Sequence, residues 1–273
     1  MPELPEVETI KESLKERILF KKVKEADIMC QKLIKYPESP EFSKNIKDKK
    51  IKELQRKGKF LIFKLSHNHN LVVHLGMTGQ LLYFSSPQKC DKHTHVTFNF
   101  ESSDQLQYND VRKFGGLWLV SDGWLRFVPG LSELGPEPLK KEFSLEYFQK
   151  TLTKKCIIKH LLLNQKNLAG LGNIYVDEIL FRAEIHPQRP ASELSAPEGE
   201  KLYFTILGVL EEAIKARGTS VVNYIDGNSQ KGEFQRHLKV YKRLGDPCFN
   251  CETPVERIVL AGRGTYYCPR CQN

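Results

Sequence analysis

The spacing of hydrophobic residues first indicates a helix close to the N-terminus. Apolar side chains recur there at intervals of three and four residues, and Pro5 followed by Glu6 suits a first helical turn. A helix is therefore predicted over residues 5–18, with an apolar face made of Val7, Ile10, Leu14 and Ile18.

From about residue 51 to residue 128, the pattern changes to short apolar runs separated by turn residues. Val96, Phe98 and Phe100 alternate with polar neighbours, as they do in a strand that buries one face. Several short strands in close succession predict an antiparallel β-sandwich or barrel. The predicted strands cover residues 59–65, 70–75, 80–84, 95–100, 105–108 and 116–120.

Helical spacing returns after the LGPEPL segment at 134–139. The longest stretch, from about 197 to 217, has one apolar face, and Gly218 suits the position just after a helix end. The fold class is therefore α+β, an N-terminal antiparallel β-sandwich with an N-terminal helix, followed by a helical domain. Shorter helical segments precede the long one, at 144–152, 157–165 and 174–185.

The charge balance points to a polyanionic partner. The chain has 42 Lys and Arg against 33 Asp and Glu, a net charge of +9. A hydrophobic content of 40% argues against a disordered chain. No apolar run approaches the ~18–20 residues of a membrane span, and the N-terminus lacks the apolar region of a signal peptide. We expect a soluble, cytoplasmic protein without membrane contact.

Four of the seven cysteines form a metal-binding pattern near the C-terminus. Two C-x-x-C pairs separated by sixteen residues predict a hairpin that holds one structural Zn²⁺ through four thiolates, and redox dithiols are the alternative. The predicted domains are thus 1–131 (β-sandwich), 132–237 (helical) and 238–273 (zinc hairpin). Cys30, Cys90 and Cys156 receive no function. The predicted zinc ligands are Cys248, Cys251, Cys268 and Cys271.

The N-terminal sequence MPELPEVET contains a candidate nucleophile. Removal of the initiator methionine leaves Pro2 with a secondary amine, which attacks an electrophilic carbon and forms an iminium ion. Glu3 beside it is a candidate acid or base. A terminus without any catalytic role is the alternative interpretation, but the helix that begins at Pro5 anchors this one.

Five motifs together resemble the formamidopyrimidine-DNA glycosylase family. They are MPELPEVET at the start, HLGMTG at 74–79, DVRKFG at 110–115, GLGNIYVDE at 170–178 and CPRCQ at 268–272, in the family's order over nearly the full length. Endonuclease VIII-type glycosylases share the Pro2-Glu3 start and the zinc hairpin. Their start is similar to MPEGPE, whereas this chain has Leu4, which favours an enzyme for oxidised purines.

The resemblance implies a bifunctional DNA glycosylase and abasic-site lyase that flips a damaged base out of the duplex. It implies that Pro2 is the Schiff-base nucleophile and Glu3 its acid/base partner. By the same resemblance, Lys59 serves β-elimination, and Arg263 serves δ-elimination and phosphate binding. Lys57 and Lys59 are both candidates for a solvated strand lysine, and only the motif favours Lys59.

The resemblance also implies a set of DNA contacts. Met77, Arg112 and Phe114 are expected to fill the gap left by the everted base, with Arg112 facing the orphaned cytosine. Segment 226–235 corresponds to the family's loop over that base. A helix–two-turn–helix unit around Leu171-Gly172-Asn173 is expected to cradle a phosphate. The remaining expected DNA contacts are His74, His93, Lys154 and Asn173.

The prediction is therefore a monomeric enzyme of base excision repair in the bacterial cytoplasm, acting at the nucleoid. Its partner is duplex DNA that contains 8-oxoguanine, formamidopyrimidines or abasic sites, and its cofactor is one structural Zn²⁺. An oxidised-pyrimidine glycosylase of the endonuclease VIII type is one alternative. A noncatalytic zinc-ribbon DNA-binding protein is the other, and a free Pro2 amine distinguishes it from the enzymes.

Overall fold

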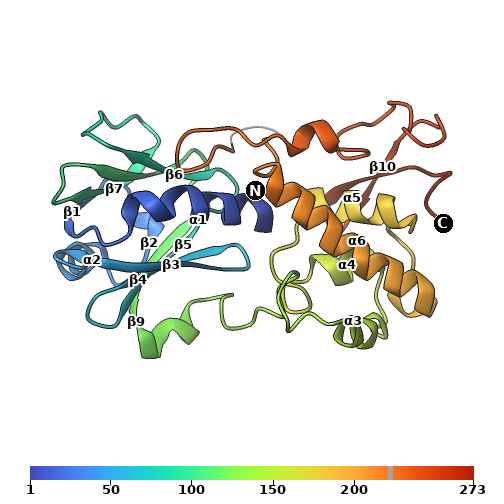
Figure 1. The fold of residues 1–273 in the computed structure, drawn as a ribbon, viewed down its shortest axis with the longest axis horizontal. Helices are drawn as coiled ribbons and strands as arrows, with labels where there is room; N and C mark the ends of the chain where they lie inside the picture. Colours follow the sequence, from blue (N-terminus) through green and yellow to red (C-terminus); the bar gives the residue numbers. More distant parts are fainter. Residues whose placement is uncertain (221–223) are drawn as a thin grey trace. The chain divides into compact units, whose positions relative to one another are not determined.

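The structure is a computed structural model that describes residues 1–220 and 224–273. The chain forms two units, and Figure 1 shows their helices and strands coloured from the N-terminus to the C-terminus. The first contains Met1–Ser132 and Ala216–Glu233, and the second contains Glu133–Lys215 and Phe234–Asn273. The three domains predicted from the sequence are defined by motifs, whereas these two units are defined by contacts. The three-domain division therefore stays a prediction. Segment 216–233, predicted with the helical domain, lies in the first unit.

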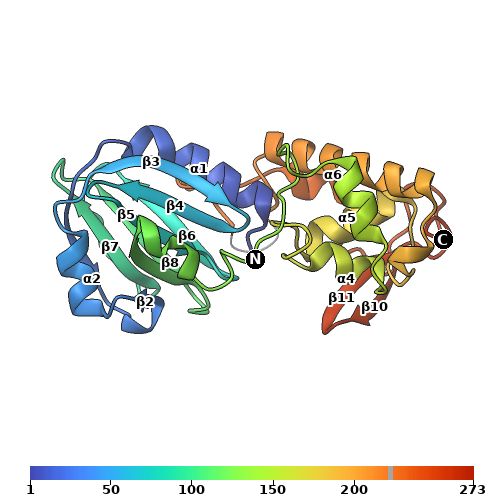
Figure 2. The same ribbon diagram turned by 90° about the horizontal axis from the view of Figure 1, so that it is seen from below.

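Two sheets face each other in the first unit (Figure 2). The four-stranded sheet has the order β1 (Val23–Ile28), β7 (Thr94–Phe100), β8 (Gln105–Asp110) and β6 (Gly79–Phe84). The five-stranded sheet has the order β2 (Ile34–Tyr36), β9 (Gly116–Ser121), β5 (His69–His74), β4 (Phe60–Leu65) and β3 (Ile51–Lys57). All neighbours are antiparallel except β2 and β9, which are parallel.

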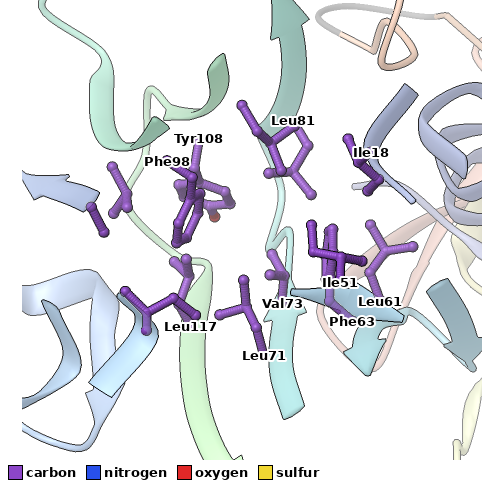
Figure 3. Close-up of a cluster of buried hydrophobic side chains, with 14 of the residues drawn as sticks. Ile18, Ile51, Leu61, Phe63, Leu71, Val73, Leu81, Phe98, Tyr108 and Leu117 are labelled. Carbon is purple, nitrogen blue, oxygen red and sulfur yellow. The ribbon is translucent and has the colours of Figure 1, made fainter. Parts of the chain in front are cut away.

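The core of this unit is the layer of side chains between the two sheets (Figure 3). Phe63 and Leu117 of the five-stranded sheet belong to the same buried cluster as Phe98 of the four-stranded sheet. Helix α1 (Leu4–Ile18) adds its predicted apolar face to that cluster. The predicted helix and all six predicted strands are therefore confirmed, and the burial on facing sheets is that of a β-sandwich.

Three strands and one helix of this unit were not predicted, namely β1, β2, β3 and α2 (Ser39–Ile46). Two short 3₁₀ segments also occur, η1 (Gln31–Leu33) and η2 (Asp122–Phe127). All three missed strands lie at sheet edges, where the outer side chains are polar and the hydrophobic alternation is weak.

The second unit is helical and ends in a hairpin. Its helices are α3 (Leu145–Leu152), α4 (Ile158–Leu163), α5 (Asn173–Ala183) and α6 (Ala196–Lys215), close to the predicted ranges. The hairpin consists of β10 (Glu256–Leu260) and β11 (Arg263–Tyr267), and η3 (Ala191–Glu193) and η4 (Phe234–His237) are short 3₁₀ turns. None of the helices among the described residues combines the length and hydrophobicity that a membrane crossing requires.

Candidate active site and nucleic-acid interface

The start of the chain is held in place by a reciprocal cap on helix α1. Glu3 is the N-cap residue, and its backbone N–H donates to the Glu6 carboxylate at 2.8 Å. The Glu3 side chain accepts from the backbone of the third helical residue, so both exchanges of a capping box are present. Pro2 and Glu3 are both buried. The terminus therefore has a fixed position despite its place at the end of the chain.

The amine at Met1 lies among four charged side chains. Burial lowers its pKa; Glu3 and Glu6 act in the opposite direction, and Lys59 and Arg112 lower the pKa further. A lowered pKa increases the fraction of amine that keeps its lone pair near neutral pH. Three of the residues predicted for catalysis or base recognition, Glu3, Lys59 and Arg112, therefore share one electrostatic environment with the N-terminus.

Glu6 joins the N-terminus to the segment that follows helix α6. Besides the bond from Glu3, its carboxylate accepts from the Thr219 backbone N–H at 2.7 Å. Gly218 is left-handed, with φ of 78°, and a Cβ there would lie 2.6 Å from the Glu6 carboxylate oxygen. Only glycine leaves room for this approach. The sequence placed Glu6 in the first turn of a helix, and Glu6 has this position together with the contact to Thr219.

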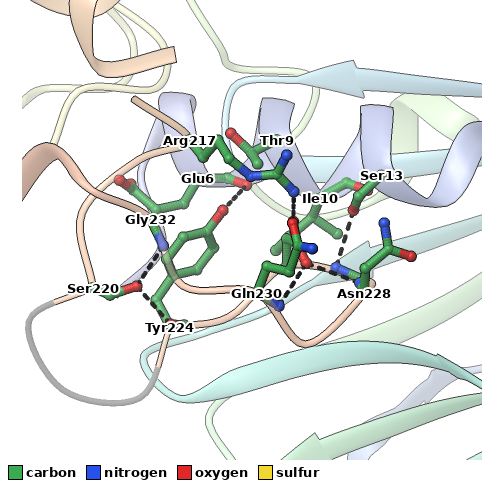
Figure 4. A network of polar contacts seen from close by, with 12 residues as sticks. Glu6, Thr9, Ile10, Ser13, Arg217, Ser220, Tyr224, Asn228, Gln230 and Gly232 are labelled. Atoms are coloured by element: carbon green, nitrogen blue, oxygen red, sulfur yellow. Dashed lines mark hydrogen bonds and ion pairs between the residues drawn. The ribbon is translucent and has the colours of Figure 1, made fainter. Parts of the chain in front are cut away.

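Segment 224–233 is hydrogen-bonded to helix α1, as Figure 4 shows. The Gly227 N–H donates to the Ser13 hydroxyl at 3.0 Å, and the Tyr224 hydroxyl donates to the Glu6 carbonyl at 3.3 Å. Asp226 accepts backbone N–H groups within its own turn and pairs with Arg217. The segment predicted to cover the everted base, 226–235, is thus bonded through Gly227 to the helix that carries the N-terminus.

Lys59 directly precedes Phe60, the residue that pairs with His74 in the five-stranded sheet. Lys59 is buried at the turn between β3 and β4, whereas Lys57 is exposed, so the structure separates the two lysines that the sequence left open. Burial and then the charge of Lys59 lower the pKa of His74 to about 4. His74 is therefore neutral at pH 7, and its Nδ1 accepts from the Gly76 N–H at 3.2 Å.

Met77, Arg112 and Phe114, expected to fill the gap left by the everted base and called the wedge residues below, come together on two turns. Met77 follows strand β5, while Arg112 and Phe114 follow strand β8, and all three side chains are exposed. The Arg112 guanidinium lies 3.1 Å from the Met77 sulfur and 4.6 Å from the centre of the Phe114 ring. His93 is adjacent, since its carbonyl accepts from the Asp110 N–H.

In the second unit, the start of helix α5 is bonded to the tip of the zinc hairpin. Asn173 is the first residue of α5, and its side-chain N–H donates to the Gly264 carbonyl at 2.8 Å. The tip itself is a two-residue turn at Ala261 and Gly262, both left-handed, as in a tight hairpin. Arg263, to which the resemblance gave δ-elimination and phosphate binding, is the first residue of β11 and is exposed.

Lys154 reaches the loop between helices α4 and α5. Its ammonium group donates to the side chain of Asn167, which is buried and also donates to the Leu161 carbonyl at 3.2 Å. This bond fixes the position of one end of a positively charged side chain beside the helix–two-turn–helix segment. Lys154 and Asn173 are thus both in the second unit, and Glu3, Lys59, His74 and the wedge residues are in the first.

A fully buried ion pair, which the sequence did not reveal, is hydrogen-bonded to strand β11 of the hairpin. Lys159 of α4 and Asp177 of α5 have no exposed side-chain area and approach to 2.6 Å. Lys159 also donates to the Thr265 hydroxyl, and Asp177 accepts from the Tyr266 N–H. Burial raises the pKa of Asp177 against the opposing effect of Lys159. Glu178 similarly accepts three consecutive backbone N–H groups, from residues 239–241.

The four predicted zinc ligands converge. Their sulfur atoms all lie within 4.8 Å of one another. The distances are 3.5 Å from Cys251 to Cys268 and 3.8 Å from Cys248 to Cys271. Zn–S bonds of about 2.3 Å in a tetrahedron place sulfur atoms about 3.8 Å apart, so the set fits one Zn²⁺. Four protein ligands leave no coordination position open, and the metal is therefore structural.

Comparison with protein families matches nearly the whole chain. Residues 1–117 match the formamidopyrimidine-DNA glycosylase N-terminal domain, and residues 134–224 match the H2TH domain of the same enzymes. Residues 245–273 match a zinc finger found in this family and in isoleucyl-tRNA synthetase. Curated relatives named formamidopyrimidine-DNA glycosylase are 44% identical in Pelotomaculum thermopropionicum and 43% in Bacillus cereus; each covers 100% of this chain and 99% of the relative.

Solved structures agree with the sequence relatives. A Lactococcus lactis variant bound to DNA that contains Fapy-dG superposes with a TM-score of 0.93 at 36% identity, and it covers 100% of both chains. The Lactococcus lactis protein in complex with abasic-site DNA gives 0.93 at 35% identity over 99% of both. A Thermus thermophilus structure gives 0.90 at 39% identity, covering 99% of this chain and 98% of the other.

Proposed function

The chain belongs to the formamidopyrimidine-DNA glycosylase family, and we propose how its own residues excise oxidised purines from duplex DNA. It is a DNA glycosylase of base excision repair, and abasic-site lyase activity is typical of the family. The DNA-bound relatives contain Fapy-dG or an abasic site, which supports damaged duplex DNA as the partner here. We propose that it acts as a monomer at the nucleoid, and its relatives are bacterial.

The observation that carries the proposal is the position of the N-terminal amine among the charges of Glu3, Glu6, Lys59 and Arg112, next to the buried residues Pro2 and Glu3. After removal of Met1, the secondary amine of Pro2 takes this environment. Its lone pair attacks C1′ of the damaged nucleotide, and the bond to the base breaks with the electron pair leaving on the base. The nitrogen then loses its N–H proton, which neutralises the departed base. Glu3 donates a proton to the sugar ring oxygen as the ring opens, and an iminium ion remains on C1′ and nitrogen.

Strand cleavage follows from the iminium ion. Loss of a proton from C2′ expels the 3′ phosphate, and a second elimination expels the 5′ phosphate. Lys59 is proposed for the first elimination because it is buried and its charge lies beside the same amine. Arg263 is proposed for the second and for phosphate binding, because it is exposed at the tip of the zinc hairpin.

DNA recognition is assigned to two groups of residues. Met77, Arg112 and Phe114 replace the everted base, and His74 and His93 flank them. Lys154 and Asn173 bind phosphates through their side chains and the start of helix α5. Segment 226–235 covers the extruded base, and its bonds to α1 support a position beside the N-terminus.

Borohydride trapping tests the proposal. Purified protein is incubated with a duplex that contains 8-oxoguanine opposite cytosine, and borohydride reduces the iminium ion to a stable covalent adduct. Mass analysis of the tryptic peptides should place the adduct on Pro2, and Pro2→Gly or an N-terminal extension should remove most of it. Base release and strand cleavage that persist with a blocked N-terminus would overturn the assignment of the nucleophile.

The same experiment separates the alternatives. A noncatalytic zinc-ribbon protein gives no adduct with any substrate. An endonuclease VIII-type enzyme gives more adduct with an oxidised pyrimidine than with 8-oxoguanine. The family matches support the purine enzyme, and a panel of lesions measured at equal concentration is the direct comparison.

A further inference from the structure

The two turns that carry the wedge residues pack backbone against backbone. Gly76 is left-handed, with φ of 58°, and a Cβ there would lie 2.6 Å from the carbonyl carbon of Phe114. A Cβ on Gly115 would lie 1.8 Å from the Tyr108 hydroxyl and 2.7 Å from the His74 carbonyl oxygen. The two turns are therefore in direct contact over bare backbone, and neither can shift without the other.

One buried carboxylate lies at the junction of these turns. Asp110 has no exposed surface. One of its oxygens accepts from the Thr78 hydroxyl at 2.5 Å and from the Arg112 N–H at 3.2 Å. The other accepts from the Gly115 N–H at 2.9 Å and from the Tyr108 hydroxyl at 3.4 Å. This carboxylate therefore fixes the backbone of the Arg112–Phe114 turn at both of its ends.

Thr78 connects the first turn to the same group. Its hydroxyl donates to Asp110 and accepts from the Arg112 N–H at 3.0 Å, so it is used in both directions. Thr78 directly follows Met77 in the sequence. A single side chain thereby couples the backbone beside Met77 to the backbone of Arg112.

We infer that Asp110 and Thr78 are positioning residues that assemble Met77, Arg112 and Phe114 into one rigid wedge before DNA is bound. The inference rests on the wedge role given to these three residues under the proposed function. A group that enters the base stack must compete with the stacking and pairing that it replaces. A wedge ordered in advance does not lose conformational entropy at that moment, so more of its contact energy goes into holding the base out.

The test uses a pair of substitutions at each position. Thr78→Val removes the bridging hydroxyl at similar volume, and Thr78→Ser keeps it. Asp110→Asn keeps the shape but puts an NH₂ group against N–H or O–H donors, so that at least one backbone donor loses its acceptor. Asp104→Asn is the control: Asp104 is also buried and accepts from Tyr83, Ser102 and Lys21, but it lies at the other end of strand β8.

Two readouts report the wedge and not general activity. The first is the ratio of single-turnover excision rates for 8-oxoguanine opposite cytosine and opposite adenine. The second is the fluorescence of 2-aminopurine placed next to a non-cleavable abasic analogue, which rises when the stack is opened. Thr78→Val and Asp110→Asn are expected to lower the rate ratio by about fivefold to tenfold and to reduce the fluorescence rise, because a lost buried hydrogen bond has effects of this order. Thr78→Ser should keep the rate ratio and the fluorescence rise at their wild-type values.

The controls separate this inference from the function on which it rests. If Asp110→Asn, like Asp104→Asn, lowers the excision rate opposite cytosine and opposite adenine by the same factor, the rate ratio does not change. Asp110 then only supports the fold, and the inference is overturned. If Arg112→Ala changes the rate ratio but Thr78→Val does not, the wedge role stands and only the preassembly is wrong. If Arg112→Ala leaves the ratio unchanged, the wedge role itself fails and the inference fails with it.

Discussion

The side-chain N–H of Asn173 lies 2.8 Å from the carbonyl oxygen of Gly264 and donates a hydrogen bond to it. This bond joins the first residue of helix α5 to the strand residue next to Arg263. The two phosphate-binding features proposed for the second unit are therefore one connected surface. The side-chain oxygen of Asn173 is buried and has no partner among the described residues.

Substitution of Asn173 should separate the hairpin tip from helix α5. Asn173→Asp replaces the donor with a negative charge that repels both the Gly264 carbonyl and a DNA phosphate. We expect Asn173→Asp to weaken duplex binding by more than tenfold and Asn173→Ala by less, measured by fluorescence anisotropy at several salt concentrations. Lys154→Gln is the comparison, since loss of one phosphate contact should reduce the salt slope by about one. Equal losses for the Asp and Ala variants would argue against the connection.

The buried pair of Lys159 and Asp177 should be costly to break from one side. Lys159→Met leaves an uncompensated carboxylate in the interior, and such losses lower the free energy of unfolding by about 3–5 kcal/mol. The double variant Lys159→Met with Asp177→Leu should recover much of the loss because no charge remains buried. Chemical denaturation measures both, and Lys166→Met, which removes an exposed pair with Glu133, serves as the control with little expected change. A Lys159→Met loss no larger than that control would contradict the prediction.

The zinc hairpin should be required for DNA binding and for the second elimination assigned to Arg263, but not for attack of the N-terminal amine on the sugar. Metal analysis should find one zinc ion per chain, and Cys248→Ser or Cys268→Ser should disorder the strands that carry Arg263. We expect weaker duplex binding in both variants while the N-terminal amine still forms an adduct with an abasic-site oligonucleotide at high concentration. Circular dichroism checks that the first unit stays folded. Full duplex affinity in a zinc-free, folded protein would remove the hairpin from the binding surface.

The strands that the sequence predicted and those that it missed differ in how many of their residues are buried. Central strands such as β5 and β7 bury most of their residues and therefore show strong hydrophobic patterns. The edge strand β3 buries only Ile51 and Leu54 of seven residues, so its pattern is that of a charged loop. Motif residues such as Cys248 were found because their spacing depends on local geometry alone.

The supporting polar residues have no such signal. Lys159 and Asp177 acquire their partners only when distant segments meet, as Lys159 meets Thr265 across 106 positions of sequence. Asp110 has local partners, but its bond to Thr78 spans 32 positions. A lysine at an interior position of a helix is expected to be solvent-exposed, and nothing in the neighbouring sequence of Lys159 indicates burial. The sequence indicated Glu6 as a residue of the first helical turn, but its bond to Thr219 depends on the fold of the first unit.

Arg112 should determine which base is tolerated opposite the lesion. A guanidinium donates to the acceptors that cytosine presents once its partner has left the stack. Arg112→Ala should lower excision of 8-oxoguanine opposite cytosine and erode the preference for cytosine over adenine. Competing duplexes in single-turnover reactions measure the ratio, and Lys113→Ala is a neighbouring exposed control. A uniform loss opposite every base would mean that Arg112 only holds phosphate.

His74 should make stability depend on pH below neutrality. Its pKa is lowered to about 4 in the folded protein, by burial first and then by Lys59, from an ordinary value of 6.5. Between these values the unfolded chain binds a proton that the folded chain does not, so the free energy of unfolding falls as pH falls. The contribution from pH 7 to pH 5 is about 2 kcal/mol.

The variant His74→Asn isolates this contribution. Its amide oxygen can still accept from the Gly76 N–H, but the side chain does not titrate between pH 5 and pH 7. Urea unfolding at half-unit pH intervals should show that the wild-type protein loses about 2 kcal/mol more than the variant across this range. Restricting the range to pH 5 and above keeps most carboxylates ionised in both proteins. Parallel pH profiles for the two proteins would mean that His74 is as free to take up a proton in the folded state as in the unfolded chain.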